Sequence, residues 1–328
     1  MKLIDMDEYL RRGEELPDIK AIGGERWFPL ETNSAEDMVE YWGGDFGCSS
    51  EYNKLRSVIM HRPGKEVENV DFEKVRFRQV VDPTLFQQQH DDLANYYRSK
   101  GVRVYYLENS REDRPNAVFC RDKIFMTPEG AIVTRLAMPE RRGEERFMAE
   151  TLAKIGVPIV RTITGNGIFE GANAMWVDRK TCILSTGVRA NRDGYSQVEY
   201  ELRRMGVEQI IPMQIPYGHA HIDGLLNLAS PDVALAHVSQ VPYDVIDALK
   251  MKGYQIIEVP SQTEAKYFYS VNFVATEPGK VVTSVGGDQT VELLEKAGIE
   301  VDVLDLSELN KGRGSVHCMT GFLKRDND

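Results

Sequence analysis

The sequence predicts an α/β fold built from five similar units, each made of a strand, a strand, a helix and a strand. Two observations lead to this prediction. Short segments that mix apolar and polar residues begin at residues 116, 167, 218, 269 and 314, so their starts lie 51, 51, 51 and 45 residues apart. The first four are each followed by a β-branched run, an amphipathic stretch and another apolar run. A fixed period of this length indicates a repeat architecture.

The elements of the four complete repeats follow in the same order. A short run rich in β-branched residues and bounded by Gly, Pro or Asp predicts a strand at 131–136, 181–186, 232–238 and 280–285. Amphipathic periodicity predicts helices at 142–155, 194–206, 243–252 and 288–297. A further strand is expected at 157–163, 208–215, 254–260 and 299–306.

The opening of the chain supplies the missing parts of a fifth unit. Residues 56–64 predict a strand that ends in a Pro-Gly turn, residues 85–101 a helix that stops at Gly101, and residues 102–108 a strand. One unit cannot bury its apolar face alone, so the five must pack together, and we expect them to close into a ring. The polar residues of the five segments then converge on the axis of this ring.

The domain prediction is one catalytic domain, residues 51–328, preceded by an extension, residues 1–50. Trp27 and Phe28 indicate that this extension packs on the domain.

Composition and charge exclude several classes of protein. The chain is 42% hydrophobic and 28% charged, and no run of 18 uncharged apolar residues predicts a membrane span. With 51 acidic against 40 basic residues and no basic block, nucleic acid is not an expected partner. The charged amino terminus lacks the apolar stretch of a signal peptide, so we expect a cytoplasmic protein. Four cysteines without a CxxC pair indicate neither a disulfide framework nor a zinc site.

Two side chains of the third segment are expected to lie together. His221 and Asp223 are two residues apart. On a strand, residues with this spacing point to the same face, which would put a base and an acid side by side.

Five residue clusters carry a resemblance to a known superfamily. They are the opening SVIMHRPG, FCRD at 119–122, FEGAN at 169–173, HID at 221–223 and GSVHCMT at 314–320. Together, in this order and spacing, they resemble the guanidino-group-modifying, or pentein, superfamily, which includes arginine deiminases, dimethylarginine hydrolases and amidinotransferases. The resemblance covers residues 50–328 and implies a five-bladed α/β propeller of pseudo-fivefold symmetry.

The resemblance also implies roles for five residues. Cys318 would be the nucleophile and His221 the general acid and base, with Glu170 as the carboxylate partner of His221 or of a substrate nitrogen. Asp122 and Asp223 would clamp the guanidinium group. Such a set suits the chemistry, because the guanidinium carbon is a poor electrophile that needs a soft nucleophile, carboxylates to fix its plane and a proton donor for the leaving amine.

Further residues are candidates for substrate recognition. Arg189 and Arg141 stand at places resembling the arginines with which the family holds a substrate carboxylate, and Arg142 is an alternative to Arg141. Asn173 stands where the family usually has an acidic residue, so the guanidinium environment is expected to be altered. His219 is the rival of His221 as the base, but only His221 matches the His-x-Asp spacing.

The predicted function is hydrolysis of the guanidino group of arginine, or of an N-substituted arginine, to citrulline and ammonia or an amine. The expected partner is a small cationic guanidino substrate, and the intermediate is a covalent amidino-thioether. The alternatives are an amidinotransferase that passes the amidino group to an amine, and an inactive binder of guanidino compounds. No cofactor or metal is expected, and a homo-oligomer is left open.

Overall fold

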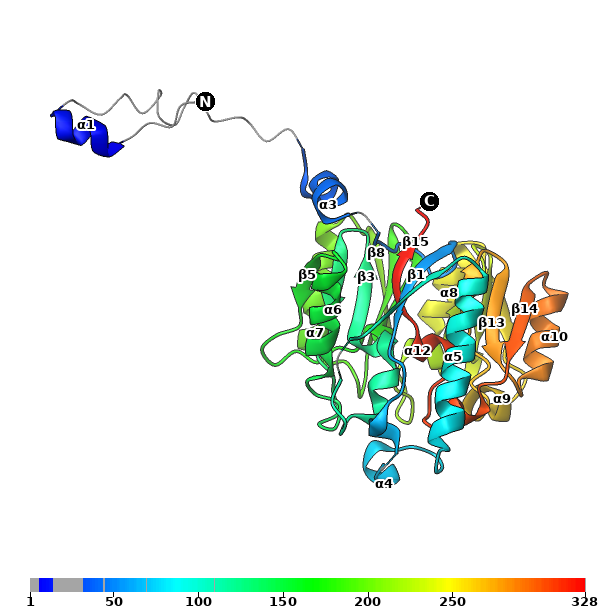
Figure 1. The fold of residues 1–328 in the computed structure, drawn as a ribbon. Helices are drawn as coiled ribbons and strands as arrows, with labels where there is room; N and C mark the ends of the chain where they lie inside the picture. The colour runs from blue at the N-terminus through cyan, green and yellow to red at the C-terminus, as the bar shows by residue number, and fades with distance from the viewer. Residues whose placement is uncertain (1–5, 14–31, 44, 69, 109, 328) are drawn as a thin grey trace.

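The computed structural model describes residues 6–13, 32–43, 45–68, 70–108 and 110–327. Within these residues the protein has an α/β fold with five three-stranded sheets (Figure 1). Their strand orders are β3-β4-β5, β6-β7-β8, β9-β10-β11, β12-β13-β14 and β15-β1-β2. In every sheet the middle strand pairs antiparallel with one neighbour and parallel with the other. The α/β class and the repeated unit are therefore confirmed, and each of these sheets is separate from the others.

The strands are short, as the apolar runs predicted. Their bounds are β1 Leu55–Met60, β2 Arg103–Tyr106, β3 Ile124–Thr127, β4 Gly130–Val133, β5 Ile159–Thr162, β6 Ala174–Asp178, β7 Thr181–Thr186, β8 Gln209–Gln214, β9 Leu226–Leu228, β10 Val233–Ala236, β11 Gln255–Glu258, β12 Val274–Glu277, β13 Lys280–Ser284, β14 Glu300–Leu304 and β15 Gly321–Arg325.

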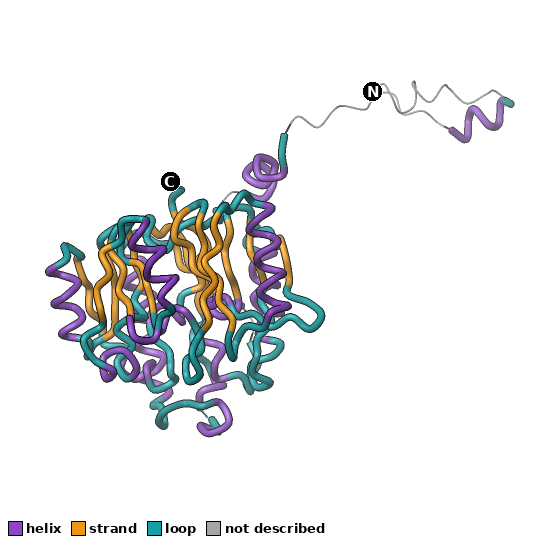
Figure 2. Tube along the Cα trace, turned by 180° about the vertical axis from the view of Figure 1, so that it is seen from behind, coloured by secondary structure: helices purple, strands orange, loops and turns teal. Residues whose placement is uncertain are grey.

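The long helices α5, α6, α7 and α10 lie on the outside of the sheets, whereas the short α12 lies near the middle of the molecule (Figures 1 and 2). The α-helices are α1 Met6–Arg12, α3 Ser34–Trp42, α4 Phe72–Val75, α5 Pro83–Ser99, α6 Glu144–Lys154, α7 Arg192–Arg204, α8 Tyr243–Met251, α9 Gln262–Lys266, α10 Asp288–Lys296, α11 Ser307–Asn310 and α12 Val316–Met319. The four long helices predicted for the complete repeats are α6, α7, α8 and α10, and their positions are confirmed.

The fifth sheet joins the first and the last strand of the fold. Its middle strand β1 pairs antiparallel with β15, with Val58 opposite Phe322, and parallel with β2. Helix α5 connects β1 to β2. The Asp82 side chain caps its start by accepting hydrogen bonds from the backbone of Thr84 and Leu85. The prediction that the opening of the chain completes a fifth unit is confirmed.

The polar residues of these segments lie in turns and short helices ahead of the strands, which corrects the expectation that His221 and Asp223 share one face of a strand. His221 immediately precedes a short 3-10 helix, η6 (Ile222–Gly224), and β9 begins only at Leu226. Residues 120–123 form the 3-10 helix η4, residues 171–173 form η5, and α12 holds residues 316–319. Asp, Asn and Gly favour such turns because their side chains or backbones compete with regular strand pairing.

The segment before β1 is partly described. Phe46 and Cys48 are buried, and the backbone N–H of Gly47 donates to the carbonyl of Leu323 at 2.8 Å. Trp27 and Phe28 lie outside the described residues, so the packing of the extension 1–50 stays a prediction.

Two structural observations bear on the class of protein. All four cysteines are free, as their spacing predicted, and Cys120 and Cys182 are completely buried. In the described part of the chain, no helix combines the length and the apolar character that crossing a bilayer requires.

Candidate active site

The predicted site residues lie in the turns that lead into the first strand of each unit. Helix α12 contacts η4, η4 contacts η5, and η5 contacts η6. Segments more than 40 residues apart in the chain therefore meet at one end of their sheets. This arrangement brings together Asp122, Glu170, His221, Asp223 and Cys318.

His221 and Glu170 form a buried pair. The Nε2 atom of His221 donates to Oε2 of Glu170 at 2.7 Å, and its Nδ1 atom lies 3.7 Å from Oδ1 of Asp122. Burial by itself lowers the pKa of His221, but the carboxylates of Asp122 and Glu170 outweigh it, so this pKa lies above its ordinary value. The imidazole is therefore favoured in its protonated form, as a proton donor must be.

Cys318 is the one cysteine of the four that is only partly buried. Its thiol donates to Oδ2 of Asp223, with the sulfur and oxygen 3.7 Å apart. Burial and the carboxylates of Asp223 and Asp122 raise the pKa of this thiol well above its ordinary value. A reactive thiolate consequently needs a cation beside it, and a guanidinium group clamped by the same carboxylates would supply one.

Arg141 is buried, although it was expected to hold a substrate carboxylate. Its guanidinium contacts Asp122 and Glu144, with 3.0 Å between Nη2 and Oε2 of Glu144, and the residue is 3% exposed. Burial lowers its pKa, but the charges of Glu144 and Asp122 outweigh it and hold the pKa well above the usual value. This geometry favours a role in fixing Asp122 in place. The alternative, Arg142, is exposed and donates to the carbonyl of Ala137.

Arg189 is better placed for an incoming ligand. Its Nη1 atom lies 3.2 Å from Oε1 of Glu170, and its side chain keeps 17% of its surface exposed. Burial disfavours the charged form of Glu170, but the hydrogen bond from His221 and the charge of Arg189 outweigh it and keep the pKa of this carboxyl below its ordinary value. Arg189 therefore touches the centre of the site and still reaches its surface.

Asn173 is completely buried beside the site. Its amide nitrogen donates to Oγ of Ser185 at 2.8 Å and to the carbonyl of Ala220 at 3.4 Å. Its Oδ1 atom has no hydrogen-bond partner among the described residues. An amide therefore serves here as a donor to neighbouring oxygens, which a carboxylate could not do.

The rival base, His219, lies apart from this network. Its Nε2 atom has no hydrogen-bond partner among the described residues, and burial, together with the nearby charges of Lys266 and His237, lowers its pKa to about 4. A histidine that is neutral over the physiological range lacks the proton that the leaving group needs.

Three residues around Cys318 were not predicted to belong to the site. Oδ1 of Asn272 accepts from the backbone N–H groups of both His317 and Cys318, at 3.1 and 3.2 Å. The ring of His317 lies between Asp223 and Glu51. Asn272 occupies the polar segment of the fourth repeat, so its position in the period was the available signal.

One cluster has the spacing of a metal site. Oxygen and nitrogen atoms of Asp122, Glu170 and His221 all lie within 4.8 Å of one another. Arg141 and Arg189 already contact the two carboxylates, and their positive charges oppose a further cation. The residues present fit a metal poorly.

Comparisons with known proteins match this architecture. Residues 75–324 match the family described as N,N dimethylarginine dimethylhydrolase, eukaryotic. The uncharacterized protein YkgA of Bacillus subtilis strain 168 is 26% identical over 277 residues, which cover 83% of this chain and 93% of that protein. The arginine deiminase of Lactococcus lactis subsp. lactis strain IL1403 is 21% identical over 401 residues, covering 85% of this chain and 98% of the deiminase.

Solved structures show the same fold. The dimethylarginine dimethylaminohydrolase of Pseudomonas aeruginosa, in complex with citrulline, superimposes with a TM-score of 0.68 at 22% identity, covering 82% of this chain and 99% of that chain. The N-terminal domain of ArgZ, a cyanobacterial arginine dihydrolase, gives a TM-score of 0.72 at 16% identity, covering 83% and 98%. Because the family match spans most of the chain, the protein belongs to the N,N-dimethylarginine dimethylhydrolase family, within the guanidino-group-modifying (pentein) superfamily of hydrolases and transferases.

Proposed function

We propose that this protein hydrolyses the guanidino group of arginine or of an N-substituted arginine, giving citrulline and ammonia or an amine. The observation that carries the proposal is the juxtaposition of two pairs. Cys318 contacts Asp223, and His221, bonded to Glu170, lies beside Asp122. A nucleophile, a proton donor and two carboxylates for the substrate cation are thus within one buried site.

The chemistry follows from the charges. The guanidinium group binds between Asp122 and Asp223, and its positive charge favours the thiolate of Cys318. The thiolate attacks the guanidino carbon, and His221 gives its proton to the departing nitrogen as the C–N bond breaks. His221, now neutral, removes a proton from a water molecule, and this water attacks the carbon of the amidino-thioether. The C–S bond then breaks, which releases the ureido product and the thiolate of Cys318.

Substrate orientation rests on Arg189. We propose that its guanidinium binds the α-carboxylate of the substrate, because it is the partly exposed arginine in contact with Glu170. Arg141 is proposed instead to hold Asp122 in position. Asn173 presents an unpartnered oxygen without a charge. This supports an N-alkylated arginine as the substrate, because alkylation leaves fewer N–H groups on the outer nitrogens and so fewer acceptors are needed there.

The test is a substrate panel. The purified protein is incubated with arginine, dimethylarginine, agmatine and citrulline, each alone and then with glycine or ornithine, and the products are followed by mass spectrometry. A ureido product without an added amine supports hydrolysis, whereas turnover only with an amine identifies an amidinotransferase. Binding without turnover in every mixture identifies an inactive binder and overturns the proposal.

The nucleophile has its own control. Cys318→Ala should bind the substrate and form no product, whereas Cys48→Ala, a change at a buried cysteine outside the proposed machinery, should leave the catalytic cycle intact. Unchanged turnover in Cys318→Ala would rule out the assignment of the nucleophile.

The arrangement of the five sheets is proposed to be a propeller with pseudo-fivefold symmetry. Contacts between consecutive units support it: β15 contacts β3, η4 contacts η5, and η5 contacts η6. Asn227 of β9 donates to the carbonyl of Phe273, just before β12, and β12 contacts β1 of the fifth unit, whose strand β15 contacts β3 of the first unit.

A further inference from the structure

His317 belongs to a buried chain of charges directly behind Cys318. Its Nδ1 atom donates to Oδ2 of Asp223 at 2.8 Å, and its Nε2 atom donates to Oε2 of Glu51 at 3.3 Å. Oε1 of Glu51 accepts from Arg121 at 3.0 Å. All four residues are at most 3% exposed. The function proposed above uses only Asp223 from this chain.

Both nitrogens of the His317 ring face a carboxylate. A neutral imidazole has one N–H group and one lone pair, and a lone pair directed at a carboxylate oxygen is repulsive. The ring satisfies both contacts only as an imidazolium, with a hydrogen on each nitrogen. The geometry therefore indicates a cation between Asp223 and Glu51.

The same oxygen of Asp223 links His317 to the nucleophile. Oδ2 accepts from the ring of His317 and from the thiol of Cys318. The backbone N–H groups of His317 and Cys318 share one acceptor, Oδ1 of Asn272, whose amide nitrogen in turn donates to the carbonyl of Asp223 at 3.3 Å. A shift of the His317 ring would consequently move the carboxylate against which the guanidinium and the thiol are aligned.

We propose that His317 is a positioning residue, a buried imidazolium that keeps the Asp223 carboxylate ionised and aimed at the guanidinium group beside Cys318, with Glu51 keeping the imidazolium charged. The inference rests on the function proposed above. It gives the segment before β1, through Glu51, a part in the chemistry of a site more than 250 residues away in the chain.

The surrounding charges agree with this role. Burial lowers the pKa of His317, but the hydrogen bonds with Asp223 and Glu51 outweigh it and the pKa is raised. Burial likewise opposes the ionisation of Asp223, and the contact with His317 reverses this and lowers the pKa of that carboxyl. The titratable and charged groups around the ring are Asp223, Glu51, Arg121, Arg325, His221 and the thiol of Cys318.

The first test replaces His317 by a neutral residue that can still donate. In His317→Gln, the positive charge next to Asp223 and Cys318 is lost, so the thiol of Cys318 should be harder to ionise. Alkylation of Cys318 by iodoacetamide, followed by mass spectrometry from pH 6 to 10, should become about tenfold slower at neutral pH, with its midpoint at higher pH. Turnover of the best substrate should show kcat about a hundredfold lower and a smaller change in KM. Wild-type alkylation and kcat in the folded variant would overturn the proposal.

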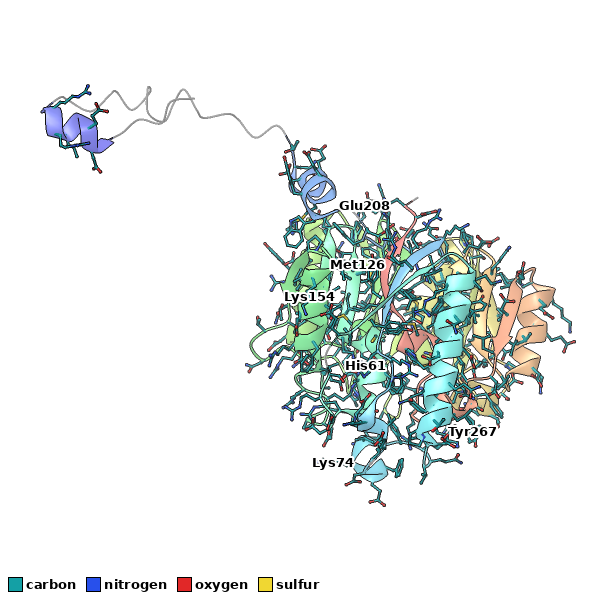
Figure 3. All side chains as sticks on the ribbon, viewed as in Figure 1. His61, Lys74, Met126, Lys154, Glu208 and Tyr267 are labelled. Atoms are coloured by element: carbon teal, nitrogen blue, oxygen red, sulfur yellow. The ribbon has the colours of Figure 1, made fainter. Side chains whose placement is uncertain are left out.

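The second test uses a matched pair of variants and covers the case in which His317→Gln does not fold. Glu51→Gln and Glu66→Gln each remove a carboxylate from a buried histidine, since Glu66 accepts from His61 at 2.9 Å (His61 is labelled in Figure 3). Without Glu51, the pKa of His317 falls. The ratio of activity at pH 9 to activity at pH 7 should then drop at least severalfold in Glu51→Gln and stay at the wild-type ratio in Glu66→Gln. Equal ratios in both variants would contradict the positioning role.

The alkylation assay separates this proposal from the proposed function. It reads the environment of Cys318 in the absence of any substrate. If no guanidino compound is turned over by the wild-type protein, the function is wrong, but a shifted alkylation profile in His317→Gln still supports the coupling of His317 to the nucleophile. If turnover is found and the profile does not shift, only the role of His317 fails.

Discussion

The thiol of Cys318 is buried next to negatively charged carboxylates, and both its burial and their charge disfavour the thiolate. His221, a few ångströms from Asp122, is shifted in the opposite sense, toward its protonated form. The site without substrate therefore stores a proton on each of its two reactive groups. A substrate cation changes this balance, and we expect the nucleophile to become reactive mainly when the guanidinium is bound.

The first prediction concerns His221→Gln. Loss of the proton donor should lower kcat by about 10²- to 10⁴-fold, because a positioned general acid contributes that much. In the wild-type protein, His221 stays protonated at and below about pH 6.5, the ordinary pKa of histidine. It loses its proton only as the pH rises through its raised pKa in the folded protein. The proton donation step should thus persist above pH 6.5 and fail at more alkaline pH.

The measurement is a pH profile of kcat for the wild type and the variant. His219→Gln is the matched control, since this neighbouring histidine lies apart from the network and should keep the wild-type profile. A large loss in His219→Gln with little effect in His221→Gln would reverse the two assignments.

The second prediction concerns Arg189→Gln. If Arg189 binds the substrate carboxylate, its removal costs a charged hydrogen bond of about 1.5–3 kcal/mol, which is about a ten- to hundredfold rise in KM for arginine. Agmatine has no carboxylate, so its KM should change much less. Steady-state kinetics with both substrates gives the ratio, and Arg142→Gln, at an exposed arginine, should leave the ratio unchanged. An equal rise for both substrates would argue against the carboxylate role.

At the scale of the element, the turn from Gly171 to Asn173 carries Glu170 into the site. Gly171 lies so close to η4 that a Cβ atom would approach the carbonyl oxygens of Ile124 and Arg121 to 2.1 and 2.3 Å. Backbone atoms on both sides leave no flexible side chain to move away. The two turns that hold Asp122 and Glu170 can therefore pack this closely only because residue 171 has no side chain.

The third prediction follows from this contact. Gly171→Ala should destabilise the protein by about 3 kcal/mol or more, at or above the upper end of the usual cost of overpacking, because backbone atoms must shift. Gly224→Ala is the control, because Gly224 lies in the corresponding turn η6 and a Cβ there meets nothing within 4 Å. Chemical denaturation of both variants gives the two values, and similar losses would contradict the steric explanation.

At the scale of the whole molecule, the first and the last strand of the fold belong to one sheet. Strand β15 places Phe322 and Leu323 in the core and pairs with β1, which also pairs with β2. The nucleophile lies three residues before β15 begins. Closure of this sheet therefore fixes both the last unit of the fold and the position of Cys318.

The fourth prediction is that a chain ending at Thr320 does not fold. Truncating one large buried side chain costs about 2–5 kcal/mol, and this deletion removes two of them along with a strand, against a total stability of about 5–15 kcal/mol. A chain ending at Asp326 keeps β15 and the ion pair between Arg56 and Asp326, and should unfold as the full-length protein does. Circular dichroism on heating distinguishes the two, and a cooperative transition in the shorter chain would contradict the prediction.

The sequence by itself determined the repeated unit, the places of its helices and strands, and five of the residues that meet, namely Asp122, Glu170, His221, Asp223 and Cys318. These depend on hydrophobic periodicity and turn residues, which act within a few residues of chain. The helices α6, α7, α8 and α10 were predicted close to their observed bounds for this reason. The His-x-Asp spacing singled out His221 and Asp223, which a turn and not a strand holds.

Only the tertiary structure decided how those residues pair. Arg141 was expected at a substrate and instead contacts Asp122 and Glu144. His317 was not predicted to belong to the site, and it lies between Asp223 and Glu51. The partners of His317 are 94 and 266 residues away in the chain. The period predicts that the turns converge. Which charged groups pair depends on the exact position of each turn, and that position is set by the packing of side chains between the units.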